Sequence, residues 1–120
     1  MRESSIVVRP QPMDSATYTA SSRLQASGLD SGIRLFEQAA RTVTLPEPPQ
    51  PIAIADYGAA TGYNSLLPVG AAVLALRART RPDHAILVAH TDLPGNDFSA
   101  LFSTLAEDPD SYLKKDAATF

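Results

Sequence analysis

Hydrophobic positions in this chain alternate between helical spacing and short continuous runs. Between residues 30 and 43 they recur every three or four positions, behind Asp30 or Ser31 as alternative N-caps, which predicts a helix of about three turns. The stripe consists of Ile33, Phe36, Ala39, Ala40 and Val43. The stretch LPEPPQP at residues 45–51 then ends the helix, because proline withholds the backbone hydrogen bond that helices and sheets need.

Two short apolar runs predict buried strands, at residues 52–55 and 85–91. The segment between them is apolar on most helical faces and predicts a helix from Asn64 or Ser65 to Arg79. With Ser65 as the cap, Pro68 lies in the first turn, where its missing N–H is not needed. A last helix is expected at residues 97–106, with one face formed by Phe98, Leu101, Phe102 and Leu105.

The order strand, glycine loop, helix, strand, acid is typical of the first β-α-β unit of a nucleotide-binding α/β fold. Parallel strands joined in this way leave their carboxyl ends at one edge of the sheet. We therefore expect Asp56, Gly58, Gly62 and Asp92 at a common ligand edge. The helix start at Asn64 offers free N–H groups there, and Asp92 is suited to accept both hydroxyls of a ribose.

Residues 1–29 are polar and rich in Ser, Thr and Pro, and they are expected to form an extended arm with a short helix near residues 21–26. The second unit, residues 30–120, carries the α/β pattern. The first 15 residues hold only three consecutive apolar positions, too few for a secretory signal. Nor does any segment reach the roughly 18 apolar residues of a membrane span, so we expect a cytoplasmic protein.

Composition excludes several classes of partner and of site. The net charge is −3, and the ten Lys and Arg residues are scattered, which argues against nucleic-acid and membrane partners. The chain has no cysteine, which excludes disulfides, thiolate nucleophiles and Cys-based zinc sites. Two histidines alone do not form a structural metal centre.

The loop after the first strand, DYGAATG, departs from the dinucleotide fingerprint G-x-G-x-x-G, and no Walker Gly-Lys-Ser/Thr occurs. An acid before a sparse glycine loop suits a ligand without a pyrophosphate, whose cationic amino-acid portion needs a nearby carboxylate. S-adenosylmethionine (SAM) is such a ligand.

Two stretches, IADYGAATGYNSLL and TDLPGNDFSALFSTL, resemble the plant-type SABATH carboxyl methyltransferases. TYTASSRLQ, residues 17–25, is similar to that family's arm segment, and the likeness runs from about Thr17 onward. The resemblance implies the N-terminal part of a Rossmann-like class I methyltransferase fold, with the arm and helix followed by β-α-β-α. It also implies SAM as cofactor, a small-molecule carboxylic acid or related acceptor as substrate, and a candidate homodimer in the full-length protein.

The resemblance also implies roles for individual residues. For the cofactor it implies Ser22 at the methionine carboxylate, Asp56 at the amino-acid portion, Gly58 as backbone room, Asn64 as a polar contact, Asp92 at the ribose and Leu93 on the adenine. Tyr18 and Gln25 would lie beside the substrate carboxylate or the cofactor's sulfur end. No catalytic residue is expected, because the sulfonium activates the methyl group and a carboxylate is already ionised at neutral pH.

Each residue also has a structural interpretation. Asp56 and Asp92 are alternatively acids that cap turns, His90 a strand-end residue with a satisfied hydrogen bond, His84 a loop-surface residue and Asp97 a helix-start residue. At the level of function, the leading hypothesis is an incomplete SAM-dependent methyltransferase whose 120 residues alone are inactive. The alternatives are a truncated non-catalytic nucleotide-binding or interaction module, and another α/β nucleotide enzyme such as a reductase.

Overall fold

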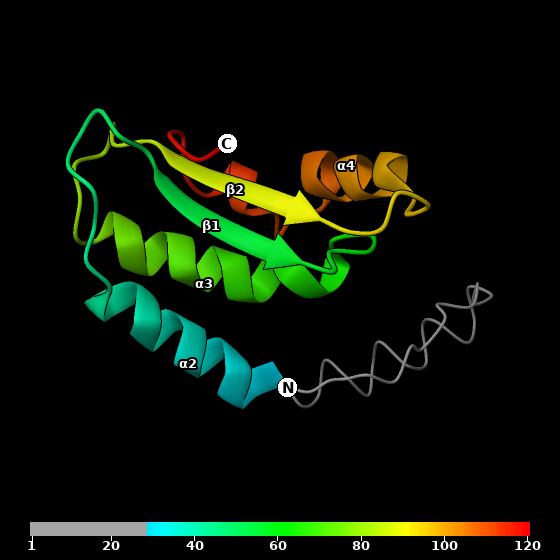
Figure 1. Ribbon diagram of the computed structural model, residues 1–120, viewed down its shortest axis with the longest axis horizontal. Coiled ribbons are helices and arrows are strands. Elements are labelled where there is room, and N and C mark those ends of the chain that lie inside the picture. The colour runs from blue at the N-terminus through cyan, green and yellow to red at the C-terminus, as the bar shows by residue number, and fades with distance from the viewer. Residues whose placement is uncertain (1–28) are drawn as a thin grey trace.

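The computed structural model describes residues 29–120, and its elements follow the expected order (Figure 1). They are α2 (Leu29–Thr42), β1 (Ile52–Tyr57), the 3₁₀ turn η1 (Tyr63–Ser65), α3 (Leu66–Arg77), β2 (Ile86–Thr91), α4 (Phe98–Glu107) and the 3₁₀ turn η2 (Tyr112–Lys114). The short helix expected near residues 21–26 lies outside the described residues. The described part of the chain is therefore an α/β structure built on one small sheet.

The strands β1 and β2 pair in parallel, as the β-α-β pattern predicts. Their register places Ile52 beside Ile86 and, at the other end, Asp56 beside His90. Both arrows in Figure 1 point the same way, so the loops after the two strands lie at the same edge. Strand β1 is two residues longer than expected, and Asp56 therefore belongs to the strand rather than to the loop after it.

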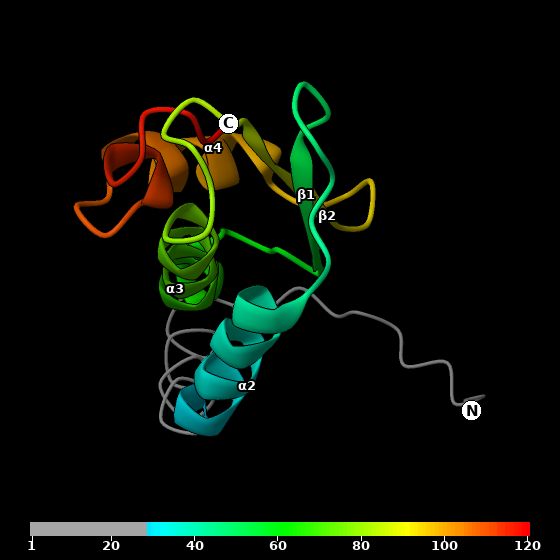
Figure 2. The same ribbon diagram turned by 90° about the vertical axis from the view of Figure 1, so that its left-hand side faces the viewer.

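Helices cover one face of this sheet. In Figure 2, α3 and α4 lie on the same side of the strands, and α2 lies beside α3. The inward residues Ile52, Ile54, Ile86 and Val88 are all buried. The alternate residues, including Ala53, Ala55, Leu87 and Ala89, are exposed. The expectation of buried strands was therefore wrong for one face, because α3 and α4 both lie on the other side.

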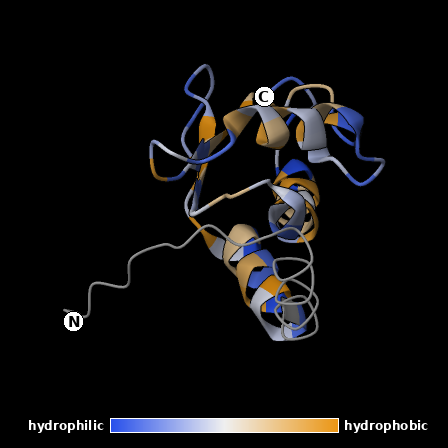
Figure 3. Cartoon of the chain, turned by 90° about the vertical axis from the view of Figure 1, so that its right-hand side faces the viewer, coloured by the Kyte–Doolittle hydropathy of each residue, from blue (hydrophilic) through white to orange (hydrophobic). Residues whose placement is uncertain are grey.

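The core lies between this covered face and the helices. Helix α3 supplies more of it than any other element, with Leu66, Val69, Ala72, Val73, Ala75 and Leu76 buried. This explains why its sequence is apolar on most faces. Figure 3 shows hydrophobic colour along the strands and helices, whereas the connecting loops are largely hydrophilic.

The helix ends refine the sequence-based boundaries. Helix α2 begins at Leu29, so Asp30 and Ser31 lie in its first turn and are not N-caps. An acid in the first turn still interacts favourably with the helix dipole. Asp97 caps α4 as expected, because its carboxylate accepts a hydrogen bond from the backbone N–H of Ala100 at 2.9 Å. Ser65 precedes α3, which puts Pro68 in the first turn, but the Ser65 hydroxyl bonds elsewhere.

Two amphipathic stripes are only partly buried. In α2, Ala40 is buried and Phe36 packs against the core, but Val43, directly after the helix, is half-exposed. In α4, Leu101 and Leu105 are buried, whereas Phe102 is 66% exposed. The periodicity identified the helices correctly but placed too many side chains in the core.

The segment after α4 returns to the sheet, which the sequence did not indicate. The backbone N–H of Ile86 donates to Ala118 at 2.9 Å, and that of Phe120 donates to the carbonyl of Ile86 at 2.8 Å. Asp116 and Arg77 form an ion pair of 2.8 Å with both side chains largely buried. Residues 116–120 are thereby held against β2 and α3. Within residues 29–120, no helix is long and apolar enough to cross a membrane.

Candidate functional site

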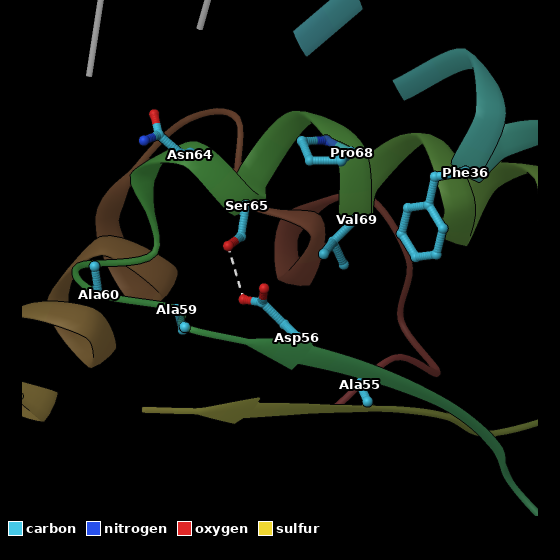
Figure 4. A pocket seen from close by; sticks show the side chains of 10 residues that line it. Phe36, Ala55, Asp56, Ala59, Ala60, Asn64, Ser65, Pro68 and Val69 are labelled. Atoms are coloured by element: carbon cyan, nitrogen blue, oxygen red, sulfur yellow. Dashed lines mark hydrogen bonds between the residues drawn. The ribbon is translucent and has the colours of Figure 1, made fainter. Parts of the chain in front are cut away.

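A cavity of about 520 Å³ opens where β1 ends and α3 begins (Figure 4). Three of its lining residues, Asp56, Gly58 and Asn64, were expected to contact the ligand. The others are Phe36, Ala55, Ala59, Ala60, Ser65, Pro68 and Val69. Phe36 comes from α2, so the cavity has polar groups at the strand end and an aromatic ring at its far side.

Asp56 is held by two donors at this cavity. One carboxylate oxygen, Oδ2, accepts a hydrogen bond from the Ser65 hydroxyl at 2.7 Å and one from His90 Nδ1 at 2.6 Å. The bond from His90, with a smaller contribution from Ser65, holds the pKa of Asp56 below its usual value of 3.8, although partial burial opposes this shift. The site therefore presents a fixed, ionised carboxylate at neutral pH.

The glycine loop adopts backbone conformations that favour glycine. Gly58 has φ of 75° and open space where a side chain would begin, which leaves room for a ligand beside the backbone. Gly62 has φ of 84°, but a Cβ there would lie 2.5 Å from Leu101 Cδ1. Gly62 was expected at the ligand edge, yet it is required chiefly by its packing against α4.

Asp92 lies beyond this loop and holds it in place. Its Oδ2 accepts a hydrogen bond from the backbone N–H of Ala60 at 2.7 Å, and its Oδ1 accepts one from the N–H of Leu93 at 2.7 Å. Asn96 Nδ2 donates to the carbonyl of Ala60 at 2.9 Å. The turn-capping interpretation of Asp92 therefore describes its contacts. Each carboxylate oxygen nevertheless has two lone pairs, so capacity remains for a ligand hydroxyl.

The remaining expected site residues are more scattered. Leu93 follows Asp92 directly and is 55% exposed, outside the lining of the cavity. Tyr18, Ser22 and Gln25 lie outside the described residues. The structure thus brings Asp56, Gly58 and Asn64 to one cavity and connects Asp92 to it through Ala60.

The two histidines differ from each other. His84 was expected on a loop surface, and this was wrong: it is 6% exposed, and its Nε2 lies 2.8 Å from the carbonyl oxygen of Gln50. That contact joins the loops before β1 and β2, which is why the ring is buried. His90 is a strand-end residue with satisfied hydrogen bonds, as expected, and it contacts Asp56 and the hydroxyl of Tyr112.

Sequence reasoning gave no site role to Phe36, Ser65 or Tyr112. The alternation of β1 and β2 offered one usable signal, because aligning IAIAD with ILVAH sets Asp56 beside His90. Tyr112 follows β2 by more than twenty residues, and no local pattern marks its return to His90.

Comparisons with known proteins bear on this site. A family model described as SAM dependent carboxyl methyltransferase matches residues 9–120. Anthranilate O-methyltransferase 2 of Zea mays is 33% identical over 98 residues, which cover 76% of this chain and 26% of that protein. Methyltransferase FUS9 of Gibberella moniliformis is 31% identical over 90 residues, covering 75% of this chain and 24% of that protein.

A third relative shares this similarity. A protein named inactive anthranilate O-methyltransferase 1, also of Zea mays, is 31% identical over 113 residues, covering 86% of this chain and 30% of that protein. The chain thus spans between about a quarter and a third of the length of these relatives.

Proposed function

This chain belongs to the family of SAM-dependent carboxyl methyltransferases, and from that premise we propose that the protein transfers a methyl group from SAM to the carboxylate of a small-molecule acid. The described residues would form the first half of the SAM-binding domain, in a Rossmann-like arrangement. The observation that carries the proposal is the fixed carboxylate of Asp56 beside a glycine loop and a cavity at the carboxyl edge of parallel strands.

The cavity fits the amino-acid end of SAM. Its volume of about 520 Å³ lies within the range of small-molecule sites, roughly 300–1,000 Å³. The ionised Asp56 would bind the cofactor's ammonium group, and the backbone at Gly58 leaves space for the chain that follows it. Asn64 would add a polar contact at the start of η1. The polar groups of the cavity and the negative charge of Asp56 thus support this part of SAM as the ligand.

Asp92 and Leu93 would bind the other end of the cofactor. The second strand carries Asp92 to the same edge as Asp56, and the unused lone pairs of its carboxylate would accept the ribose hydroxyls. The exposed side chain of Leu93 would pack on the adenine. Ser22 would reach the cofactor's carboxylate, and Tyr18 and Gln25 the substrate; these three assignments rest on the family resemblance alone.

Methyl transfer would depend mainly on how the protein positions the cofactor and the substrate. SAM supplies, when bound, a methyl group activated by its sulfonium sulfur. The chain's residues would orient the cofactor and help to exclude water, and an acid substrate needs no general base because it is ionised at neutral pH. The names of the maize relatives favour an aromatic acid such as anthranilate as the substrate class. A cytoplasmic location and a homodimer of the full-length protein complete the proposal.

The proposal is tested by calorimetric titration of SAM and of its demethylated product into the 120-residue chain. We expect micromolar binding that falls at least about tenfold in Asp92→Ala, since a charge-assisted hydrogen bond contributes roughly 1.5–3 kcal/mol. Asp97→Ala is the matched control. It removes an acid from the same loop, where Asp97 only caps α4, and it should retain the affinity of the unchanged chain.

Three results would count against the proposal. A folded chain that binds neither compound would favour the alternative of a non-catalytic module. Equal losses in both aspartate variants would show that helix α4, and not the carboxylate of Asp92, governs binding. Binding of a dinucleotide in place of SAM would instead support a reductase-like enzyme.

A further inference from the structure

His90, on β2, contacts the carboxylate of Asp56, the residue proposed to bind the ammonium group of SAM. Its side chain is 7% exposed, and its Nδ1 lies 2.6 Å from Asp56 Oδ2. Ser65 donates to the same oxygen. Within residues 29–120 no group donates to the other oxygen, Oδ1, and Asp56 borders the cavity. Both protein donors therefore converge on one oxygen, which leaves the second for a ligand.

Asp56 and Tyr112 contact the two ring nitrogens of His90 and together orient the ring. Its hydroxyl lies 2.6 Å from His90 Nε2, and the two rings stack with their centroids 5.8 Å apart. Burial, with a smaller effect of the nearby Asp56 charge, raises the pKa of Tyr112 to about 12, so the phenol stays protonated and able to donate. The ionised Asp56 carboxylate can only accept, so Nδ1 carries the proton, and Nε2 of the neutral ring then accepts from the Tyr112 hydroxyl.

This polar chain is not explained by packing. The other inward residues of β2, Ile86 and Val88, are buried aliphatic side chains, and one more would fill the position of His90 without the desolvation of a His–Asp pair. A buried polar pair of this kind does, however, fix the orientation of a carboxylate more firmly than solvent can.

We propose that His90, supported by Tyr112, is a positioning residue that locks Oδ2 of Asp56 and thereby presents Oδ1 to the ammonium group of the cofactor. The inference rests on the proposed function for the identity of the ligand. It assigns a role to a side chain that touches the carboxylate but does not line the cavity.

Two amide variants separate the two nitrogens of the ring. The side-chain N–H of Asn takes the place of Nδ1, so His90→Asn keeps the donor to Asp56 and gives up the contact with Tyr112. The side-chain carbonyl oxygen of Gln takes the place of Nε2 as an acceptor, so His90→Gln keeps the bond from Tyr112 and removes the donor to Asp56. Both variants introduce a buried amide, which makes them matched controls for stability.

The experiment combines SAM titration with a measurement of the Asp56 pKa by NMR in the 120-residue chain. We expect SAM affinity within about threefold of the unchanged chain in His90→Asn and at least tenfold weaker in His90→Gln. The pKa of Asp56 should stay lowered in His90→Asn and rise in His90→Gln.

The outcomes are distinguishable. If the unchanged chain binds SAM and the two variants bind it equally, the positioning role is wrong while the proposed function stands. If affinity falls in both variants in step with their melting temperatures, His90 acts only through the fold. If the unchanged chain is folded and binds no SAM, the proposed function fails and the ligand named here fails with it.

Discussion

The carboxylate of Asp92, at the tip of β2, accepts a hydrogen bond of 2.7 Å from the backbone N–H of Ala60, in the loop that follows β1. Asn96 donates to the carbonyl of the same residue. Ala60 has φ of 51°, a left-handed conformation that costs a non-glycine residue of order 1 kcal/mol. Two side chains of the DLPGND stretch therefore stabilise a loop conformation that the backbone alone disfavours.

Removing either side-chain hydrogen bond to Ala60 should destabilise the fold. Asp92→Ala leaves the N–H of Ala60 without this partner, and we expect the free energy of unfolding to fall by about 1–3 kcal/mol. Asn96→Ala removes the bond to the carbonyl and should cost less, about 0.5–1.5 kcal/mol, because a carbonyl is more easily solvated. Urea denaturation measures both values. Unchanged midpoints would show that the loop keeps its conformation without these hydrogen bonds.

The two glycines of the loop should differ in their tolerance of a methyl group. Gly62→Ala meets Leu101 and retains a positive φ, so we expect a loss of about 2–4 kcal/mol in unfolding free energy. Gly58→Ala meets open space and should cost only about 1 kcal/mol for the backbone conformation. Chemical denaturation of the two variants in parallel provides the comparison, and equal losses would contradict the assigned contact.

The ion pair of Arg77 and Asp116 should contribute to stability in a pH-dependent manner. The hydrogen bond from Arg77 is the main cause that lowers the pKa of Asp116 below 3.8. A lowered folded-state pKa contributes stability above the unfolded value, and this stability is lost as the pH falls through the folded value. Asp116→Asn should therefore cost about 1–3 kcal/mol at neutral pH and flatten the acid limb of a melting-temperature profile.

The chain offers a matched control for that pair. Arg81 and Asp83 form an ion pair of 3.1 Å with side chains 74% and 72% exposed. Asp83→Asn should change stability by no more than about 0.5 kcal/mol, because solvent screens exposed pairs. A larger effect there than at Asp116 would show that the return of residues 116–120 to the sheet does not depend on its ion pair.

Alkaline pH should affect stability through Tyr112. Burial raises the folded-state pKa of its phenol from the ordinary value of 10.0 to about 12. The fold therefore favours the protonated phenol, and this stability is fully present below pH 10 and is lost as the pH rises from 10 to 12. Melting curves between neutral pH and pH 11 should show a steeper decline for the unchanged chain than for Tyr112→Phe. Equal declines in melting temperature would show that a group other than Tyr112 causes the loss of stability.

The open face of the sheet should limit the stability of the 120-residue chain by itself. Parallel sheets are normally covered on both faces, and here Ala53, Ala55, Leu87 and Ala89 are exposed. We expect a broad thermal transition below about 45 °C, or dependence on a partner. A monomer that melts cooperatively at high temperature, in calorimetry with sedimentation as control, would show this expectation to be wrong.

Sequence patterns sufficed for features that depend on local periodicity and capping. The helices, both strands, the Asp97 cap and the shared edge of Asp56 and Asp92 all followed from spacing and from the geometry of parallel strands. Helix ends shifted by one or two residues, since an acid such as Asp30 serves equally as a cap or in the first turn.

Contacts between distant segments were not readable in this way. The burial of His84 depends on the position of Gln50. One partner of His90, Tyr112, lies in a 3₁₀ turn that no local sequence pattern marks. The exposure of Phe102 and Val43 depends on which neighbours reach those faces, which periodicity does not specify. Tertiary packing decided these positions.

The pairing of Asp56 with His90 also bears on how the strands find their alignment. IAIADY and ILVAHT are almost uniformly apolar in their first four residues, and the burial of one face favours the alignment that turns Ile54 and Val88 inward. A slip of one residue would set His90 beside Ala55 or Tyr57 and separate it from the only carboxylate of β1. The slipped sheet would lose the hydrogen bond between His90 and Asp56, so a polar contact at the site reinforces the alignment that the apolar residues favour.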